Sequence, residues 1–101
     1  MKVLVTGSSR GLGAEIIKVF ATNGVNVIIN YNHSEKEAYK LADSITNVNV
    51  EVIKCDISNE DEVKNMFDRI DHLDYLINNA AISDDKDLKD KSALEFVQDL
   101  K

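Results

Sequence analysis

Short apolar runs and helix-patterned segments alternate along the chain, and this alternation limits the fold more than any other feature of the sequence. The apolar runs are rich in β-branched residues, which is typical of strands buried on both faces of a sheet. Four such strands are predicted, over residues 2–6, 25–31, 48–55 and 74–78. Because helical patterns separate them, the sequence predicts an α/β fold with a doubly wound parallel sheet and right-handed crossovers.

Three helices are predicted in the connections between these strands. The first, over residues 11–23, has apolar side chains at four-residue intervals, and Gly24 is a suitable left-handed end. In the second connection, Ser34 and Glu37 have the spacing of a capping box. In the third, we expect Ser58 to cap the helix.

The end of the chain is less regular. Dense mixed charge over residues 84–91 is typical of a solvated loop, and residues 92–101 have helical spacing without a stop signal. The chain has no proline and no linker-like tract, so residues 1–101 are interpreted as one domain. The chain ends abruptly, inside this helical pattern over residues 92–101.

Composition argues against several classes of function. Twelve Lys and Arg against 18 Asp and Glu give a net charge of −6, which disfavours binding to nucleic acid or to anionic lipid. We expect no membrane segment and no secretory leader, and therefore a cytoplasmic protein. Cys55, the single cysteine, is predicted to pack in the core. The distant His33 and His72 are expected at the surface, with no metal site.

The segment from Thr6 to Gly13, Thr-Gly-Ser-Ser-Arg-Gly-Leu-Gly, follows the first predicted strand and opens the first predicted helix. A helix start carries unpaired backbone N–H groups and a partial positive charge, so a pyrophosphate fits there. The glycine spacing, G-x-x-x-G-x-G, differs from the usual dinucleotide fingerprint and from the Walker pattern. A tight strand-to-helix connection without a ligand is the alternative interpretation.

With Thr6 included, the turn resembles the T-G-x-x-x-G-x-G pattern of the short-chain dehydrogenase/reductase family. Asn78-Asn79-Ala80-Ala81 resembles that family's N-N-A-G element, and Cys55-Asp56-Ile57 resembles the segment with its adenine-binding aspartate. The resemblance covers the whole chain, and Ser8-Ser9-Arg10 with Asn30-Tyr31-Asn32 is similar to 3-oxoacyl-acyl-carrier-protein reductases. It implies a Rossmann-type NADP-binding domain with about four strands in the order 3-2-1-4, incomplete relative to the family.

The resemblance also implies a set of cofactor-binding residues near the ends of these strands. They are Gly7, Ser8, Ser9, Arg10, Gly11, Leu12, Gly13, Asn30, Tyr31, Asp56, Ile57, Asn79, Ala80 and Ala81. Ser8 and Ser9 are expected to add hydroxyl contacts, and Asp56 to accept a hydrogen bond from adenine. A turn or capping role is the alternative for Asp56, and turn formation is the alternative for Asn78 and Asn79. Ala81 stands where the family has glycine, which leaves the path of that loop open.

The end of the second strand predicts which dinucleotide is bound. An NAD site needs a carboxylate there, about 20 residues past the glycines, to hold the ribose 2′-hydroxyl. The strand instead ends in neutral residues, and no acid follows until Glu35. Arg10 resembles the basic residue of NADP-preferring members, so NADP(H) is predicted, with Asn30 and Ser34 as hydrogen-bonding helpers. An exposed turn arginine without a ligand is the alternative.

No catalytic residue can be assigned. In the family the proton donor is a Tyr in a Tyr-x-x-x-Lys helix, and no tyrosine of this chain has Lys four residues later. We therefore expect the chain to be inactive alone. The complete protein is expected to be an oxidoreductase that reduces a small-molecule or acyl-carrier-linked carbonyl by hydride transfer. A homo-oligomer is expected only for the complete protein. A non-catalytic dinucleotide-binding module and a plain α/β interaction domain are the alternatives.

In the implied order the fourth strand lies at an edge of the sheet with no further strand beside it. Unpaired edges and uncovered apolar faces promote association. The isolated chain is therefore predicted to be marginally stable or to associate.

Overall fold

The structure is a computed structural model that describes residues 1–80 of the chain. Strands and helices alternate throughout, as the sequence predicts. The elements are β1 (Lys2–Val5), α1 (Gly11–Thr22), β2 (Asn26–Tyr31), α2 (Glu35–Ser44), β3 (Val50–Lys54), α3 (Glu60–Arg69) and β4 (Tyr75–Ile77). Ala81, the predicted charged loop over 84–91 and the predicted helix over 92–101 lie outside the described residues.

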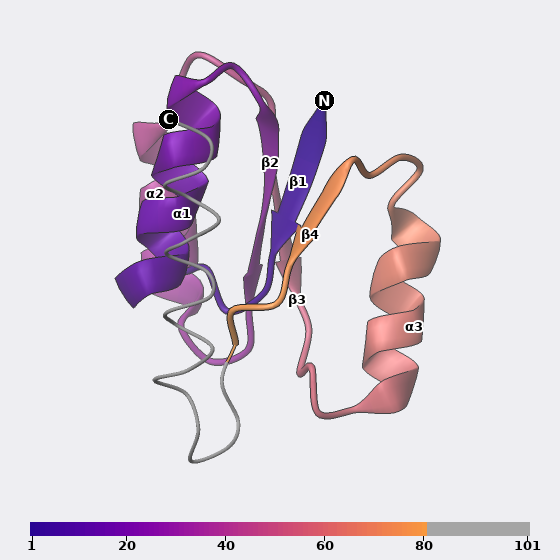
Figure 1. Ribbon diagram of the computed structural model, residues 1–101. Helices are drawn as coiled ribbons and strands as arrows, with labels where there is room; N and C mark the ends of the chain where they lie inside the picture. The colour runs from indigo at the N-terminus through magenta and orange to yellow at the C-terminus, as the bar shows by residue number, and fades with distance from the viewer. Residues whose placement is uncertain (81–101) are drawn as a thin grey trace.

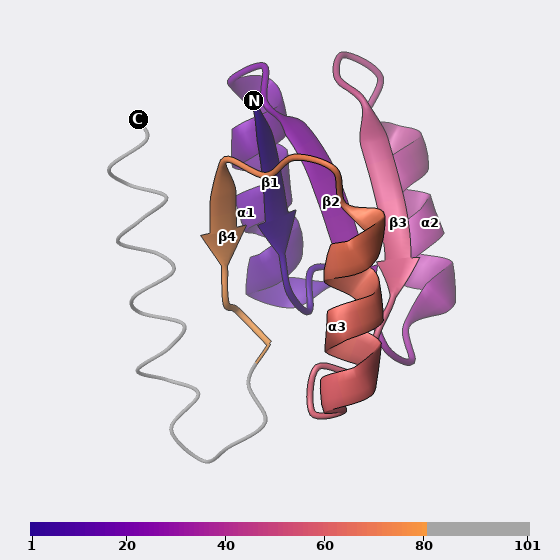
Figure 2. The same ribbon diagram turned by 90° about the vertical axis from the view of Figure 1, so that its right-hand side faces the viewer.

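The four strands form one parallel sheet in the order β3-β2-β1-β4, which confirms the predicted order. Val3 of β1 pairs with Val27 of β2 on one side and with Tyr75 of β4 on the other. Figure 2 shows β4 and β3 at the two edges, with β1 and β2 between them. All four carboxyl ends therefore meet at one end of the sheet.

Helices cover both faces of the sheet, α1 and α2 on one side and α3 on the other (Figure 1). Alternate strand residues supply the two cores, because successive side chains point to opposite faces. On the first side, Val3 and Val5 belong to a cluster with Phe20 of α1. On the other side, the cluster combines Leu4 with Met66 of α3. Apart from Lys2 at the start of β1, the inner strands contain no charged residue, as burial on both faces requires.

The ends of the helices match the predictions in part. Gly24 has φ +79° and follows the end of α1, which confirms it as the left-handed terminator. Ser34 lies at the start of α2, but the predicted capping box is wrong because its side chain makes no capping hydrogen bond. The predicted cap at Ser58 is also wrong. The hydroxyl of Ser58 donates to Asp56, and Asn59 caps α3 instead by accepting from the Glu62 amide.

The single cysteine and the two histidines lie where the sequence predicts. Cys55 is buried, and its pKa is raised, first by that burial and then by nearby carboxylates. His33 and His72 are both exposed. Within residues 1–80, no three side chains of metal-binding type are grouped to hold an ion, and no helix has the length and apolar character that a membrane span needs.

Candidate functional site

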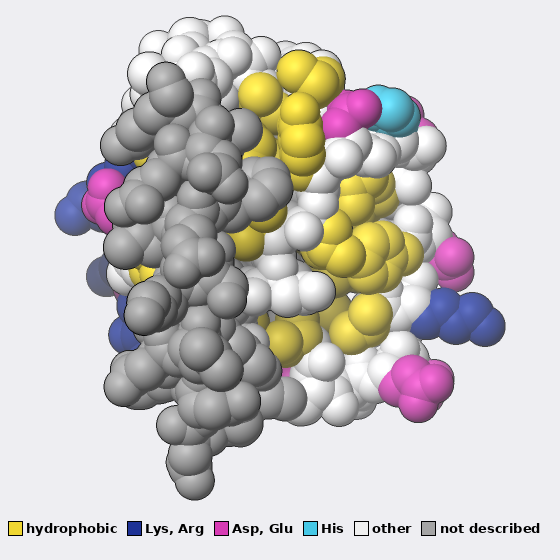
Figure 3. Space-filling view, in the orientation of Figure 1, with side chains coloured by type: hydrophobic (Ala, Val, Ile, Leu, Met, Phe, Trp, Pro, Cys, Tyr) yellow, Lys and Arg dark blue, Asp and Glu magenta, His cyan; other side chains and the backbone are white. Residues whose placement is uncertain are grey.

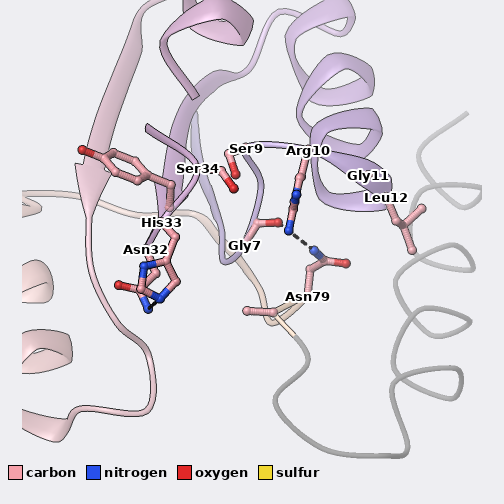
Figure 4. Close-up of a pocket in the computed structure, with 11 residues that line it drawn as sticks. Gly7, Ser9, Arg10, Gly11, Leu12, Asn32, His33, Ser34 and Asn79 are labelled. Carbon is pink, nitrogen blue, oxygen red and sulfur yellow. Dashed lines mark hydrogen bonds between the residues drawn. The ribbon is translucent and has the colours of Figure 1, made fainter. Parts of the chain in front are cut away.

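A cavity of about 480 Å³ opens at the carboxyl ends of the strands, beside the glycine-rich turn. This volume is in the range of small-molecule sites. Three segments contribute to it: the turn after β1, the residues that follow β2 and the residues that follow β4 (Figure 4). The lining consists of Gly7, Ser9, Arg10, Gly11, Leu12, Tyr31, Asn32, His33, Ser34, Asn79 and Ala80.

Two glycines of the turn are required by close backbone packing. Gly7 has φ +61°, and a Cβ built on it would lie 2.9 Å from the Cβ of Ala80. A Cβ on Gly13 would lie 2.5 Å from the carbonyl oxygen of Gly7 and 2.8 Å from the Cα of Ser8. A side chain on Gly7 would therefore clash with the chain after β4, and a side chain on Gly13 would clash with the turn after β1.

Gly11 has a different role, because open space surrounds it. Its φ of +62° places it in the left-handed region, which glycine occupies without strain. This conformation lets the chain reverse at Arg10, which has an extended backbone, and enter α1. The sequence prediction that Gly11 lets the backbone approach a ligand remains a prediction.

The first amides of α1 have no partner among the described residues; Gly11 and Leu12 line the cavity, whereas Gly13 is buried and does not. The first backbone hydrogen bond of the helix runs from the Ala14 amide to the Arg10 carbonyl, and no side chain caps this end. Among residues 1–80, no acceptor is found for the amides of Gly11, Leu12 and Gly13. Open amides and the helix dipole together make this end suited to an anion.

Ser8 and Asn30 lie beneath the turn and hold it. The Ser8 hydroxyl is fully buried, donates to the Val5 carbonyl at 2.6 Å and accepts from the Asn30 amide at 3.0 Å. The Asn30 side chain is buried as well, and it accepts from the Gly7 amide at 2.9 Å. Neither side chain lines the cavity, and direct contact of either with a cofactor remains a prediction. The sequence cannot show that both point inward.

Thr6 and Asn79 join the turn to the end of β4. The Thr6 hydroxyl accepts from the amides of Asn79 and Ala80, and the Asn79 side chain donates to the carbonyls of Thr6 and Gly7. The side-chain oxygen of Asn79 is buried and accepts no hydrogen bond from the described residues. A buried acceptor without a donor is costly, and Asn79 lines the cavity, so a ligand hydroxyl there would satisfy it.

The charges around the cavity also favour an anion. In a chain of net charge −6, the described lining contains Arg10 and His33 but no Asp or Glu. Arg10 is exposed and lines the cavity together with Gly7 and Asn79 (Figure 4). The described lining therefore carries a positive formal charge, although the chain as a whole is negative.

Three lining residues follow β2, and two of them were missed by the sequence reasoning. Asn32 and His33 line the cavity, and their side chains lie 3.2 Å apart. Ser34, named as a helper, lines it too. The signal that could have found Asn32 and His33 is position alone, because ligand sites of parallel sheets lie just beyond the strand ends. A lone histidine carries no such signal by itself.

Asp56 and Ile57 follow β3 and lie outside the cavity lining. One oxygen of Asp56 accepts hydrogen bonds from both the amide and the hydroxyl of Ser58, and these bonds lower the pKa of its carboxyl group. Asp56 thus has the turn role that was its alternative interpretation. Ile57 is partly buried and packs against the cluster around Met66. Contact of either residue with adenine remains a prediction.

A parallel sheet in this order, with a glycine-rich turn and an open helix start at its carboxyl edge, defines the Rossmann-type class of α/β domains. Comparison with known families places the chain more narrowly. The short chain dehydrogenase family matches residues 1–100. The chain belongs to this family.

Relatives of known function are similar to this chain over part of their length. NADPH-dependent aldehyde reductase 2 of Arabidopsis thaliana, a chloroplastic protein, is 38% identical over 98 residues, which cover 80% of this chain and 36% of the relative. Versicolorin reductase 1 of Dothistroma septosporum is 36% identical over 99 residues, which cover 92% and 38%. The chain thus spans well under half the length of these relatives.

A solved structure is similar as well. The crystal structure of BdcA in complex with NADPH is matched with a TM-score of 0.73 and 34% identity. The match covers 80% of this chain and 32% of that one. It supports the Rossmann-type fold.

Proposed function

We propose that this chain is the cofactor-binding part of an NADP(H)-dependent short-chain dehydrogenase/reductase. The observation that carries the proposal is the cavity at the carboxyl edge of the sheet, where open amides of α1 and Arg10 meet with no carboxylate in the described lining. Two proteins similar to this chain support it, an aldehyde reductase that is NADPH-dependent and BdcA, solved with NADPH.

In this proposal each part of the site binds a different part of the dinucleotide. The amides of Gly11, Leu12 and Gly13 hold the pyrophosphate, since they are the open donors at the helix start. The unpaired oxygen of Asn79 accepts a hydrogen bond from a ribose hydroxyl. When bound, the nicotinamide supplies the hydride for reduction of a carbonyl.

The preference for NADP(H) follows from the groups around the ribose end of the cavity. Arg10 is the permanent cation of the described lining, and guanidinium groups bind phosphates through paired hydrogen bonds. An NAD site would need a carboxylate as acceptor for the 2′-hydroxyl. Because none lines the cavity among the described residues, a 2′-phosphate meets attraction and no repulsion there.

The complete protein would carry out the reduction, with this chain supplying the cofactor half. The substrate is proposed to be a small-molecule or acyl-carrier-linked carbonyl, on the resemblance to 3-oxoacyl-acyl-carrier-protein reductases. A non-catalytic dinucleotide-binding module remains the second candidate. It is favoured by one observation, that Tyr31 is the single tyrosine of the described lining and its hydroxyl is bonded to Glu35. Cytoplasmic location and the oligomeric state stay predictions.

Titration of the chain with NADPH and NADH, followed by cofactor fluorescence, tests the proposal. We expect saturable binding of both, with the lower dissociation constant for NADPH. Replacement of Arg10 by Ala is expected to weaken NADPH binding about tenfold and NADH binding much less, because a charged hydrogen bond to the extra phosphate is lost. Lys64→Ala, which removes an exposed cation from α3, is the matched control and should change neither constant. Absence of saturable binding, or a preference for NADH, would contradict the proposal.

A further inference from the structure

Tyr31 occupies the last position of β2, where a carboxylate would select the ribose 2′-hydroxyl of NAD. Its side chain is 5% exposed and lines the cavity. The ring packs edge-on against Tyr39 of α2, with the ring centroids 6.4 Å apart. Tyr31 is therefore fixed in position, unlike a side chain at a free loop end.

The hydroxyl of Tyr31 donates a hydrogen bond to one carboxylate oxygen of Glu35 at 3.1 Å. Glu35 is the first acid after β2, and it follows directly on the three cavity-lining residues Asn32, His33 and Ser34. Despite this closeness in sequence, Glu35 does not line the cavity. The hydrogen bond to Tyr31 holds the Glu35 carboxylate outside the lining.

The tyrosine keeps its proton and so remains a donor. Burial raises the pKa of the Tyr31 hydroxyl, and the hydrogen bond to Glu35 raises it further. The pair therefore stays intact over the whole neutral range. A glutamate on the first turn of a helix has several rotatable bonds, so its carboxylate would be free to turn toward the cavity if this partner were removed.

We propose that Tyr31 is a specificity-determining residue, whose hydroxyl holds the Glu35 carboxylate away from the site of the cofactor's 2′-phosphate. This inference rests on the proposed function and names a second source of the NADP(H) preference beside Arg10. A free carboxylate near the site repels the phosphate of NADPH and accepts a hydrogen bond from the 2′-hydroxyl of NADH. Tyr31 thus has two effects. It places a neutral side chain where an NAD site has a carboxylate, and its hydroxyl restrains the nearest carboxylate, that of Glu35.

The test compares the ratio of the NADH and NADPH dissociation constants in four variants. Tyr31→Phe keeps the ring and removes the hydroxyl, and we expect the ratio to fall about two- to fivefold, the size of an exposed charge interaction. Glu35→Gln removes the charge and should keep or raise the wild-type ratio. The double variant Tyr31→Phe/Glu35→Gln should return to the ratio of Glu35→Gln alone. Glu37→Gln, on the same helix turn and outside this cavity, should leave the ratio unchanged.

The ratio separates specificity from stability, because a partly unfolded sample weakens both cofactors by the same factor. A Tyr31→Phe chain with the wild-type ratio would overturn the inference while leaving the proposed function intact. So would a reduced ratio that persists in the double variant. If the wild-type chain binds neither cofactor, the proposed function fails and this inference fails with it.

Discussion

The side-chain oxygen of Asn30 accepts a hydrogen bond from the Gly7 amide at 2.9 Å, which ties the end of β2 to the turn after β1. The nitrogen of the same side chain donates to the carbonyls of Ile53 and Cys55, at 3.3 and 3.2 Å, at the end of β3. Asn30 is 2% exposed, so water cannot replace these partners. One buried amide thus joins three strand ends beneath the candidate site.

Replacement of Asn30 by Ala is expected to lower the free energy of unfolding by about 2–4 kcal/mol, because a buried amide and two carbonyls lose their partner. Binding of NADPH should weaken as well, since the turn loses its anchor at Gly7. Urea unfolding and cofactor titration measure the two effects. Asn32→Ala, two positions further along and partly exposed, is the control and should cost much less. Equal losses in the two variants would refute the anchoring role.

The two glycines on either side of Leu12 are expected to respond differently to alanine. Gly13→Ala places a Cβ 2.5 Å from the Gly7 carbonyl oxygen, a backbone atom that cannot move aside easily, so we expect a loss of about 3 kcal/mol. Gly11→Ala meets no neighbouring atom and suffers the left-handed φ alone, which costs about 1–2 kcal/mol. Urea unfolding of both variants compares them. A larger loss for Gly11→Ala would contradict the packing described here.

The fold was predictable from the sequence because its main determinants are local. β-Branched apolar runs and helical spacing are visible in the residues themselves, and the rules for parallel sheets, with the family resemblance, then give the order β3-β2-β1-β4. Helix caps were harder, since Ser58 and Asn59 are both suitable and the choice depends on Asp56, which engages the Ser58 hydroxyl. The sequence pattern alone does not show which of these two residues caps the helix.

Site residues whose role depends on backbone conformation were predictable from the sequence. Those whose role depends on the direction of the side chain were not. Gly7 and Gly11 have the positive φ that glycine supplies. Ser8 and Asn30 were assigned to the ligand on the family resemblance, yet the Ser8 hydroxyl donates to Val5 of β1 and the Asn30 side chain donates to Ile53 of β3. His33 lines the cavity and was missed because a lone histidine carries no signal of its own, although its position just beyond β2 could have indicated it.

The acid dependence of stability should depend in part on Asp74. Its carboxylate accepts from the Lys2 amide at 2.8 Å and lies 2.9 Å from the ring nitrogen of His72. The Lys2 amide, more than His72, lowers the pKa of Asp74 below its ordinary value of 3.8. A depressed pKa in the folded state gives stability that is present above pH 3.8 and is lost as the pH falls through the lower, folded value.

Asp74→Asn should therefore make the free energy of unfolding decline less steeply on acidification. Urea unfolding at a series of pH values measures this slope. Asp68→Asn, at an exposed position on α3, is the control and should keep the wild-type slope. An Asp74→Asn chain with an unchanged slope would show that the Lys2 contact does not contribute.

Leu76 of β4 is expected to promote association of the chain. It is 44% exposed, on an edge strand that pairs with β1 alone within residues 1–80. Figure 3 shows hydrophobic side chains gathered on this face of the molecule. Leu76→Lys should reduce the average mass seen in analytical sedimentation, because a charge on an edge strand opposes pairing. Tyr39→Lys, the same kind of change on α2, should not, and a wild-type chain that stays monomeric would disprove the expectation.

The central claim is that the open start of α1 receives the diphosphate of a dinucleotide. Titration of the ¹⁵N-labelled chain with NADPH, followed by the backbone amide signals, tests it at the level of single residues. We expect saturable shifts that are largest at Gly11, Leu12 and Gly13, the amides without a partner among the described residues. No saturable shift at these three amides, or shifts confined to residues remote from the turn after β1, would contradict the claim.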